Sequence, residues 1–396
     1  MTQEPKIFPY IARLLQGAEV VWKPLGEVAE YIRGITYNKQ AEIQHKDGWK
    51  VLRANNITLK SRQLDFNDIK VIDKSIKVRD NQHLYKGDIL ICAGSGSREH
   101  IGKTAYIFEN LEYIFGGFMG VIRTNEEYLL SRFLFHYLGS SSFSTYLNKE
   151  LNSSTINNLN SSIMNKFQIP LPPLSVQQEI VRILDKFTQL EAELEAELDC
   201  RKQQYEYYRN KLLSYEGNEV EWKTLDQISE NLDSKRRPIT SGLRTSGKIP
   251  YYGASGIVDY VEDYIFDGDF LLISEDGANL LARNTPIAFS VSGKIWVNNH
   301  AHILKFRTYE ERRFIEFYLN KTDLTPYISG AAQPKLNKKN LNSIKFPIPP
   351  LEEQQRIASI LDKFDTLVNS ISEGLPKEIA LRRKQYEYYR ERLLSF

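Results

Sequence analysis

The sequence lacks the features that mark secreted, membrane-spanning or zinc-binding proteins. It has only 2 cysteines in 396 residues, Cys92 and Cys200, which lie far apart and form no CxxC motif. We therefore expect neither a disulfide framework nor a zinc site. No apolar run approaches the roughly 20 residues that a membrane-spanning helix needs, and the chain does not open on a basic and then apolar leader. These absences predict a cytoplasmic protein.

A large excess of positive charge is also missing. The chain has 52 Lys and Arg against 50 Asp and Glu, which gives a formal net charge of +2. Domains that bind nucleic acid through overall charge are much more basic, so any such binding here must come from local patches. The composition is otherwise that of a globular protein large enough for two or three cores.

Motifs of catalysis are missing as well. Residues 93–104 resemble a phosphate-binding loop, but five residues separate Gly96 from the Gly-Lys-Thr at 102–104 where that loop requires four. A nucleotide-binding enzyme is therefore disfavoured, although binding of ATP by the isolated chain would support it. Glu275 and Asp276 lie in a polar turn, and no helical pair of histidines has metal-ligand spacing. We expect a protein without catalytic activity of its own.

The main feature that is present is a long helical passage that occurs twice, at residues 170–215 and 347–396. Ile-Leu-Asp-Lys-Phe stands at 183–187 and again at 360–364. Apolar residues recur every three or four positions in both copies, which places one apolar stripe along each helix. A helix of about 40 residues would be roughly 60 Å long. The matching stripes predict two long helices that pair antiparallel as a coiled coil.

Two local features of these passages predict where the helices begin and break. Ser175 and Gln178 have the spacing of a capping box directly after two prolines. The second passage is four residues longer than the first, and Gly374 and Pro376 interrupt its stripe. We expect a break or kink at that point.

A second repeat marks two globular heads. Residues 17–25 resemble residues 217–225, and each copy precedes a series of short apolar runs that predict strands. The runs are 49–52, 69–72, 89–92, 105–108 and 119–122 in the first head, then 249–252, 270–273, 287–291 and 303–306 in the second, with helices expected at 132–138 and 310–319. Each head also has a Gly-Asp pair before an apolar strand.

These repeats predict an α+β fold with two globular α+β domains separated by two long antiparallel coiled-coil helices, in a pseudo-two-fold circular repeat. The expected divisions are an N-terminal tail that completes the repeat at 1–20, the first head at 21–168, the first spacer helix at 169–215, the second head at 216–346 and the second spacer helix at 347–396.

Polar and basic residues in the heads are candidates for DNA contacts, because Lys and Arg neutralise phosphates while amide, hydroxyl and guanidinium groups read base edges. Each one alone is more often an ordinary solvated residue, but together they fall on corresponding loops. The candidates are Asn55, Lys60, Arg62, Gln63, Arg98 and Lys103 in the first head, and Arg236, Arg237, Tyr252, Ser255, Asn279, Arg283, Asn299, His300, Gln333, Lys335 and Lys338 in the second.

The helices carry further apolar residues outside the expected seam. Ile180, Tyr207, Ile357 and Tyr388 are such residues, and we expect them to bury against partner subunits. An exposed apolar face of this kind would make the isolated chain poorly soluble.

The repeated passages, the Glu-Trp-Lys-x-Leu openings of the heads, and residues 251–256 and 273–279 together resemble the specificity subunit (HsdS) of type I restriction-modification systems. The resemblance covers essentially the whole chain and is strongest in the helices and the second head. In the first head only the Gly-Asp before an apolar strand matches.

The resemblance implies that each head is a target-recognition domain for one half of a split site in double-stranded DNA, and that the helices set the gap and dock two modification subunits. It also implies that S-adenosylmethionine is bound by those subunits, that ATP and Mg are bound by restriction (translocase) subunits, and that this chain binds no cofactor. The alternative is a non-enzymatic coiled-coil scaffold whose heads bind protein or carbohydrate. Weak and salt-insensitive DNA binding would favour the alternative.

Overall fold

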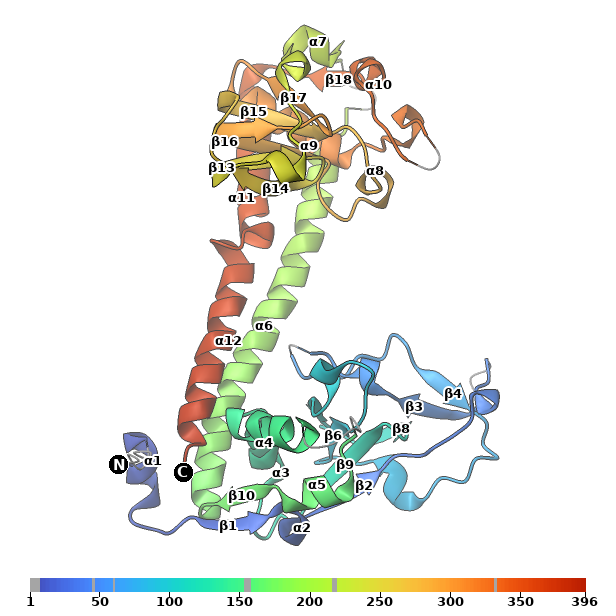
Figure 1. The fold of residues 1–396 in the computed structure, drawn as a ribbon, viewed down its shortest axis with the longest axis vertical. Coiled ribbons are helices and arrows are strands. Elements are labelled where there is room, and N and C mark those ends of the chain that lie inside the picture. The colour runs from blue at the N-terminus through green and yellow to red at the C-terminus, as the bar shows by residue number, and fades with distance from the viewer. Residues whose placement is uncertain (1–7, 45–46, 60, 153–157, 216–218, 331–332) are drawn as a thin grey trace. The chain divides into compact units, whose positions relative to one another are not determined.

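The computed structural model describes residues 8–44, 47–59, 61–152, 158–215, 219–330 and 333–396 (Figure 1). The chain forms two compact units, one of residues 1–193 with 379–396 and one of residues 194–378. Unit 1 therefore contains both ends of the chain, as a circular repeat requires. Within the described part, no helix is long and apolar enough to cross a membrane.

The α-helices, in chain order, are α1 (Pro9–Leu15), α2 (Leu25–Val28), α3 (Ser131–Tyr137), α4 (Ser141–Asn152), α5 (Ser161–Lys166), α6 (Leu174–Leu212), α7 (Leu225–Ile228), α8 (Asn279–Ala282), α9 (Tyr309–Lys321), α10 (Lys338–Ser343), α11 (Leu351–Asn369) and α12 (Gly374–Leu393). The strands of unit 1 are β1 (Val21–Pro24), β2 (Ala29–Arg33), β3 (Trp49–Leu52), β4 (Lys70–Ile72), β5 (His83–Leu84), β6 (Ile89–Cys92), β7 (Thr104–Tyr106), β8 (Leu111–Phe115), β9 (Met119–Thr124) and β10 (Gln168–Leu171). Those of unit 2 are β11 (Glu221–Lys223), β12 (Glu230–Asn231), β13 (Ser246–Gly253), β14 (Gly256–Val261), β15 (Phe266–Ser274), β16 (Ala288–Val297), β17 (Ala301–Lys305) and β18 (Phe346–Ile348).

The head of unit 1 is built from two sheets with strand orders β2-β9-β6-β7 and β4-β3-β8-β5. The short apolar runs expected at 49–52 and 89–92 coincide with β3 and β6. All four residues of β6 are buried, because the strand lies inside its sheet between β9 and β7. The core beneath it continues into α3, where Phe133 and Leu134 are fully buried.

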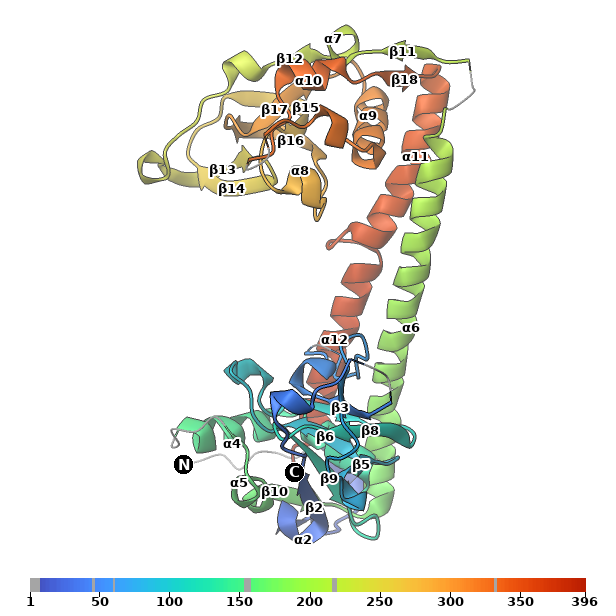
Figure 2. The same ribbon diagram turned by 90° about the vertical axis from the view of Figure 1, so that its right-hand side faces the viewer.

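The head of unit 2 is built on one sheet with the order β12-β17-β15-β16-β13-β14. β15 lies in its middle and pairs antiparallel with both β16 and β17. α9 packs between this sheet and α11, which Figure 2 shows within the unit. The expected strands at 270–273 and 303–306 and the expected helix at 310–319 thus fall on β15, β17 and α9.

Each head enters and leaves through one pair of antiparallel strands. β1 pairs with β10, with Trp22 opposite Pro170, and β11 pairs with β18, with Trp222 opposite Pro347. These pairs lie directly before α6 and α11 in the chain. The repeat seen in the sequence is therefore a repeat of the strand pair and the helix that comes after it.

The expected capping box at the start of α6 is wrong, because α6 already includes Ser175 in its first turn. A buried glutamine secures this end instead. The Nε2 of Gln177 donates to the carbonyl oxygen of Pro172 at 2.9 Å. Gln354 repeats the bond at the start of α11, donating to Pro349 at 2.8 Å. Both satisfy a carbonyl group that would otherwise be buried without a partner.

The expected break in the second passage is confirmed. α11 ends at Asn369 and α12 begins at Gly374. Gly374 has a φ of 69°, and a Cβ at this position would collide with the carbonyl oxygen of Thr366. Only glycine meets both conditions without strain.

The long helices contact each other within each unit. In unit 1, Phe187 of α6 stacks on Tyr389 of α12 with ring centroids 5.4 Å apart, and Glu191 pairs with Arg383. Later residues of α6 thus meet earlier residues of α12, which is the antiparallel order. In unit 2, Tyr205 of α6 stacks on Phe364 of α11 at 6.1 Å. Coiled-coil packing of these helices stays a prediction.

The aspartate of the repeated Ile-Leu-Asp-Lys-Phe motif joins each head to its long helix. Asp185 accepts from Nε of Arg132 in α3 at 2.8 Å. Asp362 accepts from Nε of Arg313 in α9 at 2.7 Å. The motif recurs because the same attachment is made twice.

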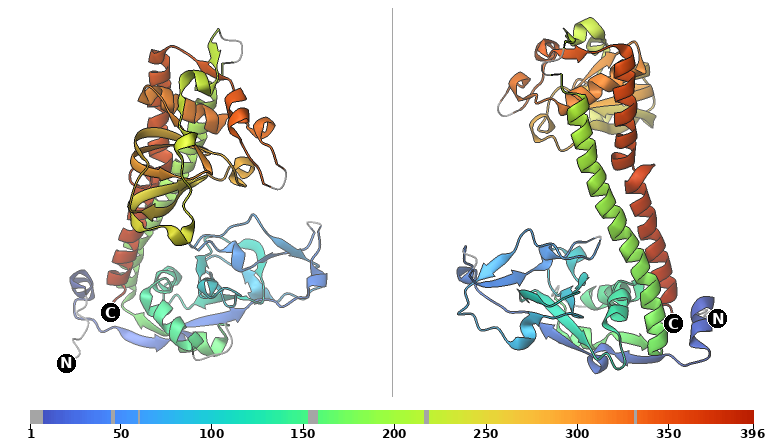
Figure 3. Two further views of the ribbon diagram at one scale, coloured as in Figure 1. Left: turned by 45° about the horizontal axis from the view of Figure 1, so that its top comes forward. Right: turned by 180° about the vertical axis from the view of Figure 1, so that it is seen from behind.

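The N-terminal helix α1 completes unit 1. Its Ile11 and Leu15 belong to the same buried cluster as Leu393 of α12. Figure 3 shows α1 beside the C-terminal end of α12 within this unit. A short tail at the start of the chain thus packs where the chain ends.

Candidate nucleic-acid interface

Loops from distant parts of the sequence meet at one end of the head in unit 1. They come after β3 and β6, before β9, and before α5. The amide N of Gly116 donates to the carbonyl oxygen of Leu52 at 3.0 Å, and the amide N of Gly94 donates to that of Phe118 at 3.0 Å. Gly94 also forms an isolated β-bridge with Asn158. These bonds hold residues 53–55, 94–96, 116–118 and 158 together.

Unit 2 repeats this junction with different side chains. The amide N of Asn298 donates to the carbonyl oxygen of Tyr252 at 3.1 Å, and the amide N of Glu275 donates to that of His300 at 2.9 Å. Asp276 forms an isolated β-bridge with Lys335. The shared hydrogen-bond pattern makes residues 253–255, 275–277, 298–300 and 335 the counterparts of the loops in unit 1.

This correspondence pairs individual residues of the two heads. Asn55 corresponds to Ser255, Phe118 to His300, and Asn158 to Lys335. The backbone is shared and the side chains differ, so the same framework presents two different chemical surfaces.

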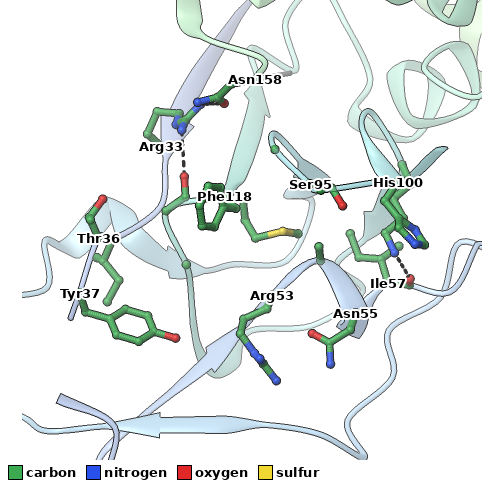
Figure 4. A pocket seen from close by; sticks show the side chains of 18 of the residues that line it. Arg33, Thr36, Tyr37, Arg53, Asn55, Ile57, Ser95, His100, Phe118 and Asn158 are labelled. Atoms are coloured by element: carbon green, nitrogen blue, oxygen red, sulfur yellow. Dashed lines mark hydrogen bonds between the residues drawn. The ribbon is translucent and has the colours of Figure 1, made fainter. Parts of the chain in front are cut away.

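In unit 1 the loops line a groove of about 1500 Å³ (Figure 4). Its wall contains the basic side chains Arg33, Arg53 and Lys103, together with His100 and the amide of Asn55. Glu42 and Asp65 also line it, so the groove has a modest excess of positive groups. Two wall atoms, Nε of Arg53 and Nδ1 of His100, are buried without a hydrogen-bond partner among the described residues.

The basic groups of the groove are held in place by neighbours. Arg33 donates through Nη1 to Oδ1 of Asn158 and through Nη2 to the carbonyl oxygen of Gly117, both at 2.9 Å. Lys103 donates through Nζ to the carbonyl oxygen of Ile57 at 2.7 Å, and burial lowers the pKa of this lysine. The groove wall is therefore fixed before any ligand binds.

The junction in unit 2 contains a network of charged side chains. Arg236 pairs with Glu275 at 2.7 Å, and Lys335 pairs with the same carboxylate at 3.2 Å. Burial alone would raise the pKa of Glu275, but its hydrogen bond with Arg236 and the nearby positive groups hold that pKa below its usual value. His300 contacts Asp276 at 2.9 Å. The exposed atoms of this junction thus offer both donors and acceptors.

The structure brings several predicted contact residues onto these junctions. The candidates exposed there are Asn55, Ser255, Asn299, His300, Gln333 and Lys335. Gln63, Arg98, Arg237 and Lys338 are exposed on other segments of the heads. Lys60 lies outside the described residues.

Other candidates are held within their own heads. Tyr252 is half-buried and its ring lies 6.1 Å from that of Phe289. Asn279 closes its own loop, because its side chain bonds both the N–H and the carbonyl oxygen of Thr285. These two side chains shape the junction rather than face away from it.

Three predicted arginine contacts are wrong, because their guanidinium groups are already used inside the heads. Arg62 lies 3.9 Å from the ring centroid of Phe135 and donates to that residue's carbonyl oxygen at 2.7 Å. Burial lowers the pKa of Arg62 to about 10. Arg236 is tied to Glu275, and Arg283 donates to the carbonyl oxygen of Thr322.

Sequence reasoning missed the groove residues Arg33, Phe118 and Asn158. Phe118 comes after two glycines in a short turn, which carries no charge or amide signal of DNA contact. The signal that could have found it was the internal repeat, because Phe118 occupies the position of His300.

The predicted docking residues divide into two groups. Ile180 and Ile357 are fully buried in the cores of their own units, so their prediction as partner contacts is wrong. Their apolar side chains anchor the starts of α6 and α11. Tyr207 and Tyr388, in contrast, are 59% and 52% exposed at equivalent places of the repeated helix motif.

No group of three or more His, Cys, Asp or Glu side chains with the geometry of a metal site occurs among the residues that the structure describes. Cys92 is buried and Cys200 is exposed, and neither forms a disulfide.

Comparison with known proteins identifies the family. Residues 18–199 and 218–381 match the family described as Type I restriction modification DNA specificity domain. The chain is 30% identical to the specificity subunit of the type I restriction enzyme EcoR124I/EcoR124II of Escherichia coli over 418 residues, which cover 98% of this chain and 97% of that protein. A putative type I restriction enzyme specificity subunit of Haemophilus influenzae, S.HindORF215P, is 44% identical over 184 residues, covering 46% of this chain and 47% of that protein.

Solved structures show the same fold. The S subunit of a type I restriction-modification system from M. genitalium has a TM-score of 0.60 at 15% identity, with 100% of this chain and 98% of that chain covered. A chain from a structure that concerns complex assembly of the type I R-M system has a TM-score of 0.57 at 18% identity, with 95% and 98% covered. Specificity subunits are non-catalytic, and catalysis belongs to partner subunits. This chain belongs to the family of type I restriction-modification DNA specificity subunits.

Proposed function

We propose that each head reads one half of a bipartite sequence in double-stranded DNA, and that the long helices set the gap between the halves and dock two modification subunits. The observation that carries this proposal is the repeated junction of loops, which has one backbone framework and two sets of side chains. A protein that reads two different half-sites needs this combination, since phosphate contacts position the protein while side chains at base edges specify the sequence.

The remaining parts of the activity are assigned to partners. S-adenosylmethionine is bound by the modification subunits, which methylate adenine, and ATP and Mg are bound by restriction subunits that translocate DNA. The chain itself binds no cofactor and works in the cytoplasm. The exposed Tyr207 and Tyr388 support two docking places, because they are the same residue of a motif that occurs twice.

Mapping of methylated adenines tests the proposal. The chain is co-expressed with its modification subunits, and genomic methylation is sequenced for the unchanged protein and for Asn299→Ala. Asn299 is exposed on the junction of unit 2. We expect methylation to relax at one position of one half-site, with discrimination reduced by about 1–3 kcal/mol, while the other half-site and the gap stay the same. Relaxation in both half-sites, or in neither, would contradict separate reading by the two heads.

Salt dependence distinguishes the scaffold alternative. Binding through phosphates releases counterions, so affinity must fall steeply as salt rises. Weak binding to DNA that does not respond to salt, measured with the modification subunits present, would favour heads that bind protein or carbohydrate.

A further inference from the structure

Phe118 is a large apolar side chain left bare in the groove of unit 1. It is 70% exposed and stands in the turn between β8 and β9. In Figure 4 its ring lies among Arg33, Ser95, Arg53 and Asn55. An exposed phenylalanine in a polar groove is unfavourable in water, which points to a ligand that covers it.

The turn that carries Phe118 is fixed. Its carbonyl oxygen accepts hydrogen bonds from the amides of Ala93 and Gly94, at 2.8 and 3.0 Å. The carbonyl oxygen of the preceding Gly117 accepts from Arg33. A Cβ at Gly117 would lie 2.8 Å from Oγ1 of Thr36, so the close approach of these segments requires a small residue. The backbone is rigid although the ring is bare.

The surroundings of the ring define the ligand's chemistry. Arg53 and Lys103 supply positive charge, while Asn55 and the unpartnered Nδ1 of His100 supply polar atoms. A ligand that suits this groove has a flat apolar face, polar edges and a negative backbone. Stacked base pairs of DNA have all three.

We propose that Phe118 is a wedge that inserts between two neighbouring base pairs of the half-site bound by unit 1 and kinks the duplex there. This inference rests on the proposed function and adds the position and manner of contact. Apolar wedges unstack base steps and bend DNA. Pyrimidine–purine steps deform most easily, so a wedge adds sequence preference without a hydrogen bond to a base.

The second head differs at this position. His300 stands where Phe118 stands in the first head, and its Nδ1 lies 2.9 Å from Oδ2 of Asp276. A polar ring held by a carboxylate makes an edge contact and does not enter the base stack. Unstacking is therefore expected in one half-site only.

The test uses the chain in complex with its modification subunits. Duplexes carry the fluorescent base 2-aminopurine at each position of both half-sites in turn, except at the methylated adenines, and end-labelled duplexes report the bend by energy transfer. We expect the unchanged complex to raise fluorescence severalfold at one step of one half-site. Phe118→Ala should lose this signal and bind about 10- to 100-fold more weakly, whereas Phe118→Leu should retain most of both.

Phe108→Ala is the matched control, because Phe108 is 68% exposed in the same head but does not line the groove. It should leave fluorescence and affinity unchanged. A Phe118→Ala complex that keeps the signal would overturn the wedge. So would a Phe118→Ala chain that fails to assemble with modification subunits while Phe108→Ala assembles, since Phe118 would then dock a protein.

Two results for the unchanged complex separate the wedge from the proposed function. Specific methylation with no unstacked step would overturn the wedge alone. Absence of any sequence-specific binding would overturn the proposed function itself.

Discussion

Among the individual residues of the head junctions, Lys335 is suited to a phosphate contact. Its side chain is about half exposed and its Nζ lies 3.2 Å from Glu275, so it is positioned without being buried. We expect Lys335→Ala to weaken binding to all sequences alike and to reduce the slope of log affinity against log salt by about 1. Titration of labelled DNA at several salt concentrations measures this slope.

Lys305→Ala is the control for that measurement. Lys305 is also exposed, at the other end of β17. It should leave the slope unchanged. A change in base preference with Lys335→Ala at constant slope would assign Lys335 to base reading instead.

His136 makes the stability of unit 1 depend on pH. It is fully buried, and its Nε2 lies 2.7 Å from Asp185 while its Nδ1 lies 2.9 Å from the hydroxyl of Tyr386. Burial lowers the pKa of His136 to about 4, although the hydrogen bond to Asp185 opposes that shift. Since Tyr386 donates to Nδ1, the neutral ring fits both partners.

The sign of the effect is set by the two pKa values. Between pH 6.5 and 4 the unfolded chain takes up a proton at His136 and the folded chain does not, so the free energy of unfolding decreases as pH falls. The loss from this group approaches about 3 kcal/mol by pH 4. His136→Phe should remove this loss, and the site should accept the ring because Phe317 occupies the same place relative to Arg313 in α9. Urea unfolding at pH 7, 5.5 and 4.5 tests it, and parallel curves for both proteins would contradict it.

At the scale of elements, the interruption between α11 and α12 is expected to control the gap between half-sites. Residues 370–373 stand between the two helices. Deleting four residues from a helical passage shifts the rest of the helix by about 6 Å and turns it by roughly one turn. We expect deletion of 370–373 to change the permitted gap by about one to two base pairs and to leave both half-sites unaltered. Replacing the same four residues with alanines keeps the length and should keep the gap.

Methylome sequencing measures both variants. An unchanged gap after the deletion would show that the passage is not a ruler.

The sequence predicted elements whose signal is local. β3 and β6 are short, buried and apolar, and α3 and α9 have helical periodicity, so each could be recognised from its own residues. The pairing of β3 with β8 is parallel and joins residues about sixty positions apart. No local pattern reports such a pairing, and β8 itself, with Glu112 and Tyr113 among its five residues, is not a plain apolar run.

The same distinction applies to the candidate site. Exposed polar residues such as Asn299 and Gln333 were found because their side-chain chemistry suits DNA. Arg62 was misassigned because its burial against Phe135 depends on a contact between distant segments. Phe118 was missed because its importance comes from the groove around it rather than from its own residue type.

At the scale of the whole molecule, the repeat predicts how many partners bind. Tyr207 and Tyr388 are exposed at the same position of the two helix motifs. We expect each of Tyr207→Ala and Tyr388→Ala to lower the loading from two modification subunits to one, with a loss of at least about 2 kcal/mol at the affected place. The double variant should bind neither, and the unchanged chain alone should be poorly soluble.

Sedimentation at fixed partner concentration counts the bound subunits. Tyr128→Ala is the control, because Tyr128 is similarly exposed but lies outside the repeated motif. Loss of both partners from a single substitution would mean that the two docking places are not independent.

The strand pairs β1–β10 and β11–β18 make each head a cassette with adjoining ends. Everything between Pro24 and Gln168 is inserted where two neighbouring backbones run in opposite directions, and the same holds between Lys223 and Phe346. A gene segment for an unrelated head that begins and ends on such a pair could replace the resident one by recombination within the flanking repeats. A bacterium could thereby acquire a new target specificity in one genetic step while every partner subunit stays as it was.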